Sequence, residues 1–439
     1  MKYISTNKEA DPVSFSTAAL QGLAPDGGLY VPKDWPRLSE RFLVNLGNES
    51  LQDIGFEVSR LFVDELDKEV LKKVVDDALN FDAPLVKLTE TEKVLELFHG
   101  PTLAFKDFGA RFMSRLFSAL RKEADQDLII LAATSGDTGS AVAQGFLEVE
   151  GIKVCLLYPS SKVSHIQEQQ LTTAGQNVTA LEVDGTFDDC QKMVKQAFSD
   201  NGLNEQLLLS SANSINIARL LPQVFYYLHA VAQLDSDYPP IFCVPSGNFG
   251  NLTAGLMAQK IGMPVSGFIA ATNVNDVFPI YLRTGEFKSR TSEQTISNAM
   301  DVGNPSNFER ILHLFNGNHE QIKQHIWAAS FSDSETKKGI KKVYQSKNYL
   351  MDPHTAVGYC AVQKYKRQSA GYFGEDQSAP FIILSTAHPA KFGDVIEPVV
   401  DQEISVPDRL AQCLKKEKQS IPLNADYQNL KEWLLEEYG

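Results

Sequence analysis

The chain has 439 residues, which exceeds one ordinary hydrophobic core and predicts two or three domains. Hydrophobic residues make up 43% and charged residues 22%, as in globular proteins and unlike disordered chains. The formal net charge of −14 argues against binding to nucleic acid or to an anionic membrane, because such proteins need a basic surface. A small basic pocket for an anionic substrate is still compatible with this charge.

The sequence shows no targeting or metal-binding pattern. The opening residues, MKYISTNKEAD, lack the apolar core of a secretory signal, and no segment approaches the ~20 apolar residues of a membrane helix. The five cysteines lie outside any CxxC pattern, and the eight histidines have no HExxH-like spacing. We therefore expect a cytoplasmic protein with reduced thiols and no metal. The sequence leaves open a monomer or a homodimer.

Before residue 81 the chain reads as several short helices. Residues 52–66 have helical apolar spacing, at Ile54, Val58, Leu61, Phe62 and Leu66. Two strand-like runs follow at 85–88 and 93–98.

From residue 128 onward, strands alternate with helices. Predicted strands cover 128–133, 153–158, 178–183, 241–244, 267–271 and 381–384, and predicted helices cover 139–148, 163–173, 188–198, 216–234 and 251–261. Such alternation indicates an α/β protein with parallel sheets covered on both faces. The acidic tail, 424–438, is predicted to form an amphipathic helix.

Ligands of open parallel sheets bind beyond the carboxyl ends of the strands, so the loops after these strands are the candidate sites. The loop PSGNFGN, residues 245–251, has two glycines and a following helix N-terminus, a combination suited to binding a phosphate through backbone N–H groups. The alternative is a simple strand-to-helix turn. The loop TSGDTGS, residues 134–140, offers hydroxyls at a helix start, which suits an anion or an ordinary N-cap.

Two further segments carry groups that suit catalysis. In HGPTLAFKDFG, residues 99–109, Lys106 follows an apolar stretch, and a desolvated lysine can form a Schiff base; the alternative is a surface lysine. In STAHPAKFG, residues 385–393, a hydroxyl could bond a ring nitrogen, or the segment could only cap a helix. Second-anion candidates are Asn216 with Arg219, and the polar loop that contains Lys162 and Ser164.

These four loops, in this order, resemble those of the threonine synthases, which are fold-type II pyridoxal-phosphate (PLP) enzymes. HGPTLAFKDFG is similar to the PLP-lysine segment, SGDTG to the substrate-carboxylate loop, PSGNFGN to the cofactor-phosphate loop and TAHPAKF to the segment facing the pyridine nitrogen. The N-terminal PDGGLYVP resembles the longer bacterial and fungal branch. The resemblance implies two parallel-sheet domains covered by helices, plus a mainly helical N-terminal region. The expected boundaries are 1–92 for the N-terminal region, 93–127 with 226–439 for the large PLP-binding domain, and 128–225 for a small mobile domain.

The resemblance also implies an activity, the conversion of O-phospho-L-homoserine and water to L-threonine and phosphate. Lys106 would hold PLP and then move protons, Thr386 would face the pyridine nitrogen, and the cofactor phosphate would be held by Gly247, Asn248, Phe249, Gly250 and Asn251. Ser135, Asp137 and Thr138 would line the substrate side. Asp137 stands where related enzymes carry an asparagine that contacts the PLP 3′-oxygen. For the substrate phosphate we assign Lys162, Ser164, Asn216 and Arg219.

Two alternatives stay open. The same fold supports dehydratases and a phospho-lyase that releases a 2-oxo acid, and the fold by itself does not choose between them. A non-catalytic phosphate-binding protein would use residues 247–251 without needing Lys106. A dehydrogenase is disfavoured, since no GxGxxG follows a predicted strand.

Overall fold

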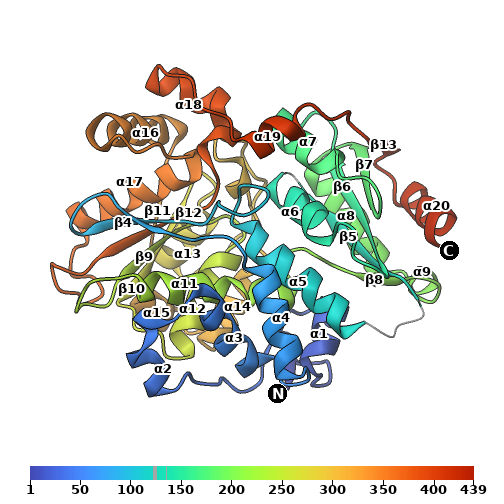
Figure 1. Cartoon of the computed structure of the whole chain (residues 1–439), viewed down its shortest axis with the longest axis horizontal. Helices are drawn as coiled ribbons and strands as arrows, with labels where there is room; N and C mark the ends of the chain where they lie inside the picture. Colours follow the sequence, from blue (N-terminus) through green and yellow to red (C-terminus); the bar gives the residue numbers. More distant parts are fainter. Residues whose placement is uncertain (122–125, 135) are drawn as a thin grey trace.

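Two large β-sheets organise the described part of the molecule, and a third, two-stranded sheet lies in the N-terminal region. The computed structural model describes residues 1–121, 126–134 and 136–439. The first sheet has the strand order β11-β10-β9-β12-β4-β3, with bounds Ile326–Ser330, Gly267–Thr272, Ile241–Pro245, Phe381–Ser385, Glu92–Glu96 and Leu85–Lys87. Its labelled strands β4, β9 and β10 lie on the left of the molecule in Figure 1, and those of the other large sheet lie on the right. All neighbouring strands are parallel except β3, which pairs antiparallel with β4. The predicted α/β class is confirmed.

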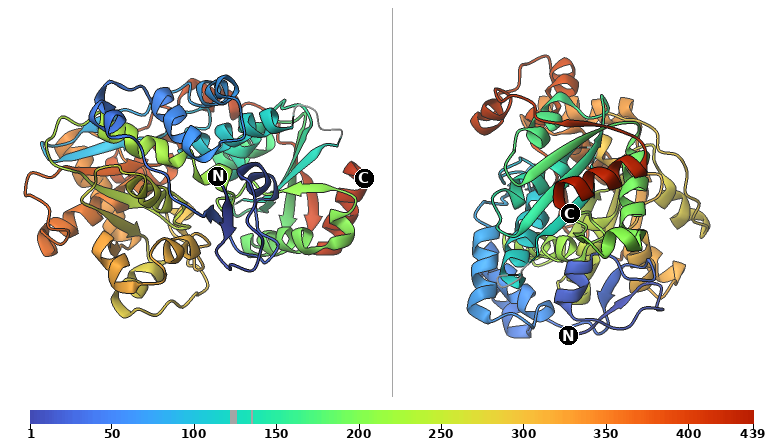
Figure 2. Two further views of the ribbon diagram at one scale, coloured as in Figure 1. Left: turned by 90° about the horizontal axis from the view of Figure 1, so that it is seen from below. Right: turned by 90° about the vertical axis from the view of Figure 1, so that its right-hand side faces the viewer.

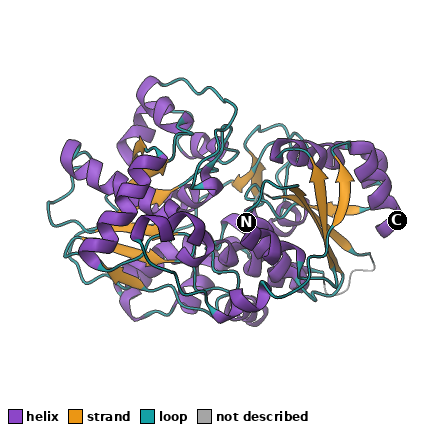
Figure 3. Cartoon of the chain, turned by 90° about the horizontal axis from the view of Figure 1, so that it is seen from above, coloured by secondary structure: helices purple, strands orange, loops and turns teal. Residues whose placement is uncertain are grey.

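The second sheet is entirely parallel and has the order β13-β7-β6-β5-β8, with bounds Ile421–Asn424, Val178–Asp184, Ile152–Pro159, Leu128–Ala133 and Leu208–Ser210. Figure 3 shows its strands apart from those of the first sheet. The sequence-based prediction places the whole of 226–439 in the large domain. In the structure, however, β13 near the end of this range pairs with β7 of the second sheet. The C-terminal helix α20 (Tyr427–Tyr438) lies beside these strands (Figure 2) and buries Leu430 and Leu434 in their core.

The first sheet is buried on both faces because its strands alternate between two cores. In β9, Phe242 and Val244 belong to the large core that the N-terminal region shares, while Ile241 and Cys243 pack into a second core with α17 (Pro353–Gln368). Continuous apolar runs of this kind are typical of parallel strands covered by helices on both sides. The sheet is therefore a rigid base, and its carboxyl-end loops are the parts free to bind a ligand.

The N-terminal region, which is mainly helical, packs against the large core. It contains β1, α1, β2, α2, η1, α3 and α4, with bounds Tyr3–Ser5, Phe15–Gln21, Tyr30–Pro32, Glu40–Val44, Leu46–Asn48, Leu51–Phe62 and Lys68–Ala78. The predicted spacing is confirmed on α3, where Ile54, Val58 and Phe62 are buried. Leu61 is only partly buried, and the predicted segment 52–66 is too long, because α3 ends at Phe62 and leaves the partly buried Leu66 outside the helix.

One predicted helix, 216–234, is two helices in the structure. The chain forms α10 (Ile217–Leu220) and then α11 (Gln223–Ala232), with Pro222 as the N-cap of the second. Proline has no N–H and its ring clashes with the preceding turn, so the helix restarts there. The break turns the short α10, which carries Arg219, toward the start of α5 (Lys106–Leu120), with which it is in contact.

The remaining helices cover the sheets and connect their strands. Those of the second sheet are α6, α7, α8 and α9, with bounds Asp137–Phe146, His165–Thr172, Phe187–Ser199 and Asn201–Asn204. The others are α12, α13, η2, α14, α15, α16, η3, α18 and α19, with bounds Gly250–Lys260, Val277–Thr284, Asn298–Met300, Phe308–Leu314, His319–His325, Asp333–Lys347, Pro389–Phe392, Gly393–Val400 and Asp408–Cys413. In the part of the chain that the structure describes, no helix is long and apolar enough to cross a membrane.

Candidate active site

Three of the four sequence-selected loops meet at one edge of the first sheet. Strands β9, β12 and β4 are parallel neighbours, so the loops that follow them emerge on the same side. The loop after β12 runs beside the loop after β4: Ala104 forms an antiparallel bridge with Ala387, and the Phe105 N–H donates to the Thr386 carbonyl over 2.9 Å. Thr386 therefore lies next to the residue that precedes Lys106.

Lys106 is the first residue of α5 and has the properties of a nucleophilic amine. Its side chain keeps partial solvent exposure, but its Nζ lies within the protein, 4.7 Å from the centre of the Phe105 ring. Burial and, to a smaller extent, the nearby Arg219 cation lower its pKa to about 8, while Asp137 opposes the shift. Among the described residues Nζ has no hydrogen-bond or ion-pair partner. A substantial share of the amine is thus neutral near physiological pH and available to react.

The loop between β9 and α12 presents free backbone donors. The N–H groups of Gly247, Asn248 and Phe249 donate to no acceptor among the described residues. Phe249 adopts a left-handed conformation with φ of 57°, which directs the chain into the helix. A Cβ on Gly247 would lie 2.6 Å from Met300 Cα, so only glycine fits there without displacing its neighbour. Unpaired N–H groups at a helix N-terminus fit a phosphate, as the predicted PLP site requires.

The two asparagines of this loop do different things. Asn251 is turned into the protein: it accepts from Ser246 Oγ over 2.6 Å, and its Nδ2 donates to the Pro245 carbonyl over 2.8 Å. Asn248 ties the loop to neighbouring segments, donating to Ser214 Oγ and accepting from the Ser306 N–H, each over 2.6 Å. The side chains shape the loop, and its backbone is left to bind a ligand.

The loop after β5 brings Asp137 toward Lys106. Thr134 Oγ1 accepts from the Gly139 N–H over 2.8 Å and so shapes the turn that begins α6. Asp137 is buried and accepts from Lys391 Nζ at 2.6 Å and from Gln167 Nε2 at 3.1 Å. Burial acts to raise the pKa of Asp137, but Lys391 and Gln167 outweigh it and hold the pKa below its usual value. Thr138 is half-buried at the first turn of α6, and Ser135 lies outside the described residues.

Arg219 is the anion-site candidate that the structure brings close to Lys106. The guanidinium is buried, its Nη1 donates to the Ala212 carbonyl over 2.5 Å, and its Nε has no acceptor in the described part of the chain. It packs on α5 at Gly109, where an added Cβ would lie 2.8 Å from Nε. A buried guanidinium with an unused donor is suited to an anionic ligand.

The other three anion-site candidates lie in different surroundings. Asn216 caps α10, and its Nδ2 donates to the carbonyls of Ala19 and Ser211, so both of its donor hydrogens are used within the protein. Ser164 caps α7 and donates to Gln167 Oε1 over 3.1 Å. Lys162 is exposed at the same loop. In this conformation Asn216 has no donor left for an anion, because the carbonyls of Ala19 and Ser211 accept both of its Nδ2 hydrogens.

Two residues of the site were missed in the sequence. Lys391 was part of the quoted TAHPAKF segment but received no role, although it is fully buried with its Nζ against Asp137. The signal was present, because a lysine six residues after the end of a buried strand, between Ala390 and Phe392, resembles the setting that singled out Lys106. Gln167 carried no such signal, since polar helix residues are usually exposed.

Comparisons with known proteins cover the entire chain. Residues 81–384 match the family described as pyridoxal-phosphate dependent enzyme, residues 2–79 match the threonine synthase N terminus, and residues 355–434 match the threonine synthase C-terminal family. The chain is 41% identical over 438 residues to the threonine synthase of Serratia marcescens and 40% identical over 438 residues to that of Escherichia coli (strain K12), covering 99% of both chains in each case.

Solved structures agree with the sequence comparisons. The crystal structure of threonine synthase from Escherichia coli superposes with a TM-score of 0.91 at 38% identity, covering 100% of both chains. The PLP-bound threonine synthase from Brucella melitensis superposes with a TM-score of 0.91 at 33% identity, covering 100% of this chain and 99% of that one. The chain therefore belongs to the threonine synthase family of pyridoxal-phosphate dependent enzymes.

Proposed function

We propose that this protein is a threonine synthase that converts O-phospho-L-homoserine and water to L-threonine and phosphate with PLP as cofactor. The observation that carries the proposal is the placement of Lys106. Its partly neutral amine stands near a buried cation, Arg219, and a buried carboxylate, Asp137. A phosphate-binding protein has no need for a depressed lysine pKa, whereas a PLP enzyme needs a neutral amine to bind the cofactor aldehyde.

We assign the cofactor contacts to the edge of the first sheet. Lys106 would hold PLP through Nζ, the N–H groups of the loop 247–251 would bind its phosphate, and the Thr386 hydroxyl would face its ring nitrogen. When bound, PLP supplies an electron sink for the negative charge that develops on the substrate carbon. Lys106 Nζ, once free, can take the proton from the substrate Cα and return it, because its pKa lies near the working pH.

We assign the substrate to the surroundings of Lys106, where Arg219 and the loop after β5 bring their charges close. Arg219 would bind an anionic group of the substrate through its guanidinium. Lys162 and Ser164 remain candidates for the substrate phosphate, and Ser135 and Thr138 for the substrate side of the α6 loop. We also propose that residues 421–438 act with 128–225 as one unit, since β13 and α20 pack on the second sheet.

A cytoplasmic location is part of the same proposal. All five cysteines are free, and Cys155, Cys190 and Cys243 are buried, as is usual in a reducing compartment.

Product analysis tests the function against its alternatives. Purified protein loaded with PLP is incubated with O-phospho-L-homoserine, and phosphate, threonine and 2-oxo acid are measured together. Equal amounts of phosphate and threonine support the proposal, while phosphate with a 2-oxo acid supports a phospho-lyase. Lys106→Ala is the matched control, which should release neither product. A protein that takes up no PLP, judged by its absorbance before and after borohydride reduction, would favour simple phosphate binding.

A further inference from the structure

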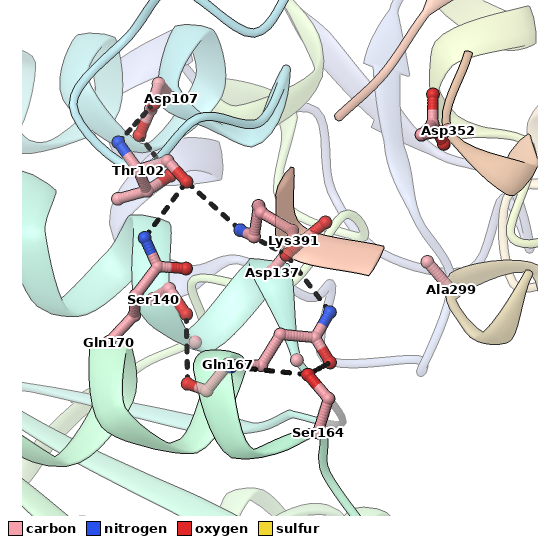
Figure 4. Close-up of polar contacts among 12 residues, drawn as sticks. Thr102, Asp107, Asp137, Ser140, Ser164, Gln167, Gln170, Ala299, Asp352 and Lys391 are labelled. Atoms are coloured by element: carbon pink, nitrogen blue, oxygen red, sulfur yellow. Dashed lines mark hydrogen bonds and ion pairs between the residues drawn. The ribbon is translucent and has the colours of Figure 1, made fainter. Parts of the chain in front are cut away.

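Lys391 is a fully buried lysine at the boundary between the two sheets. It follows β12 of the first sheet in the short helix η3, and its side chain is 0% exposed. Its Nζ lies 2.6 Å from Asp137 Oδ1 and donates to the Thr102 carbonyl over 3.0 Å (Figure 4). Asp137 follows β5 of the second sheet, so this one ammonium joins loops from both sheets.

The contacts around Lys391 form a connected polar network that flanks Lys106. Gln170 Nε2 also donates to the Thr102 carbonyl, over 3.2 Å. Thr102 is fixed in turn by Asp107, which accepts from its N–H over 2.9 Å and from its hydroxyl over 2.8 Å (Figure 4). Asp107 directly follows Lys106 in α5. Lys391 thus contacts both the turn that leads into Lys106 and the Asp137 carboxylate, whose charge acts on Lys106.

The charges of this network act on Lys106 from several elements. Arg219 of α10 lowers the pKa of Lys106 and Asp137 of α6 raises it, while burial lowers it most. Lys391 and, more weakly, His354 of α17 lower the pKa of Asp137 and so keep it ionised despite burial. Lys391 and Arg111 also lower the pKa of Asp107, against the larger effect of burial, which raises it. Without Lys391, the carboxylate would lose its principal counter-charge.

We propose that Lys391 is a positioning residue whose buried ammonium fixes the Asp137 carboxylate and the Thr102 turn around Lys106. The inference rests on the proposed role of Lys106 as the cofactor-binding amine. In this proposal the Lys391–Asp137 pair has a net charge of zero beside Lys106. Two single substitutions change this net charge in opposite directions. Lys391→Met leaves a net negative or neutral pair, and Asp137→Asn leaves a net positive pair.

The test measures the protonation of Lys106 directly in the full chain without cofactor. Limiting acetic anhydride labels neutral amines, and peptide mass spectrometry gives the extent of labelling at Lys106 as a function of pH. We expect Asp137→Asn to lower the apparent pKa of Lys106 by on the order of one unit, because the substitution removes a charge that raises this pKa and leaves the Lys391 cation unpaired. Lys391→Met should not lower it. The double variant should return it toward the original value.

Matched variants separate positioning from general stability. Lys391→Arg keeps the charge and should keep the pKa of Lys106, even where its larger head lowers the melting temperature. If both single variants move the pKa of Lys106 in the same direction, or if only the melting temperature changes, the proposal is wrong. If a single variant does not fold, the test uses the charge-neutral double variant and Lys391→Arg. In both, Lys106 should be acetylated with the same pH dependence as in the original protein, and a shifted pH dependence would contradict the proposal. The readout is independent of turnover, so failure of the proposed reaction would appear separately in the product analysis.

Discussion

Gly247→Ala is the substitution whose effect the structure determines most directly. The new Cβ would lie 2.6 Å from Met300 Cα and 3.0 Å from Met300 C, and both of these are backbone atoms. Ordinary van der Waals contact begins near 3.4 Å, so the loop and the Met300 segment must separate by roughly 0.8 Å. Neither side has a flexible side-chain end that could turn away.

The expected cost follows from overpacking in a well-packed region, which is typically about 1–3 kcal/mol. If the loop moves rather than η2, the N–H groups of Gly247, Asn248 and Phe249 shift from the position that we propose for the cofactor phosphate. We then expect PLP affinity to fall about 5- to 150-fold, since each 1.4 kcal/mol is a factor of about ten. The assay is a titration of cofactor-free protein with PLP, followed by absorbance.

The control is Gly47→Ala, at a glycine whose nearest atom to a new Cβ is the Ala232 carbonyl oxygen at 3.5 Å. This variant should bind PLP like the original protein. Unchanged PLP affinity in Gly247→Ala, with an unchanged melting temperature, would refute the view that the 247–251 backbone binds the phosphate.

Three further predictions concern charge. The rate of covalent PLP capture by Lys106 should rise with pH around an apparent pKa of about 8; near pH 7.5 about a quarter of the amine is neutral, against about one in a thousand for an ordinary lysine. Arg219→Met should raise that apparent pKa, because a cation beside the amine is lost, and should raise KM for the phosphorylated substrate more than tenfold; equal KM values would remove Arg219 from the substrate site. Burial raises the pKa of Asp107 to about 6. The folded chain therefore binds a proton that the unfolded chain has already released, and the free energy of unfolding should fall as pH rises from about 4 to about 6, by on the order of 3 kcal/mol. Asp107→Asn should flatten this part of the pH dependence, measured by denaturant titrations at several pH values. An unchanged slope of the unfolding free energy against pH would contradict the raised pKa of Asp107.

Local patterns in the sequence predicted the elements that depend on near neighbours. The apolar spacing of Ile54, Val58 and Phe62 predicted α3, and the short apolar runs predicted the buried strands β5, β9 and β12. The loops after these strands were identified because parallel strands place their carboxyl ends on one edge. A break at Pro222 was also readable locally, although the 216–234 segment was predicted as one helix.

Contacts between distant residues could not be predicted in this way. The pairing of β13 with β7 joins segments more than 200 residues apart, and the tail sequence by itself indicates only a helix. Asn216 was assigned to an anion site because it shares a helical face with Arg219, but its amide is used by Ala19 and Ser211. Which partner a polar side chain takes depends on what the folded chain places beside it.

The sequence by itself therefore determined the fold class and the loops that follow the parallel strands, because these follow from periodicity and from motifs a few residues long. Its resemblance to a known family predicted Lys106 as the cofactor lysine. Only the tertiary structure decided the electrostatics of the site. The pKa of Lys106 depends on Arg219 and Asp137, and Asp137 stays ionised through Lys391, a residue 254 positions away in the chain. Such charges act through space over distances set by packing, and no local pattern records them.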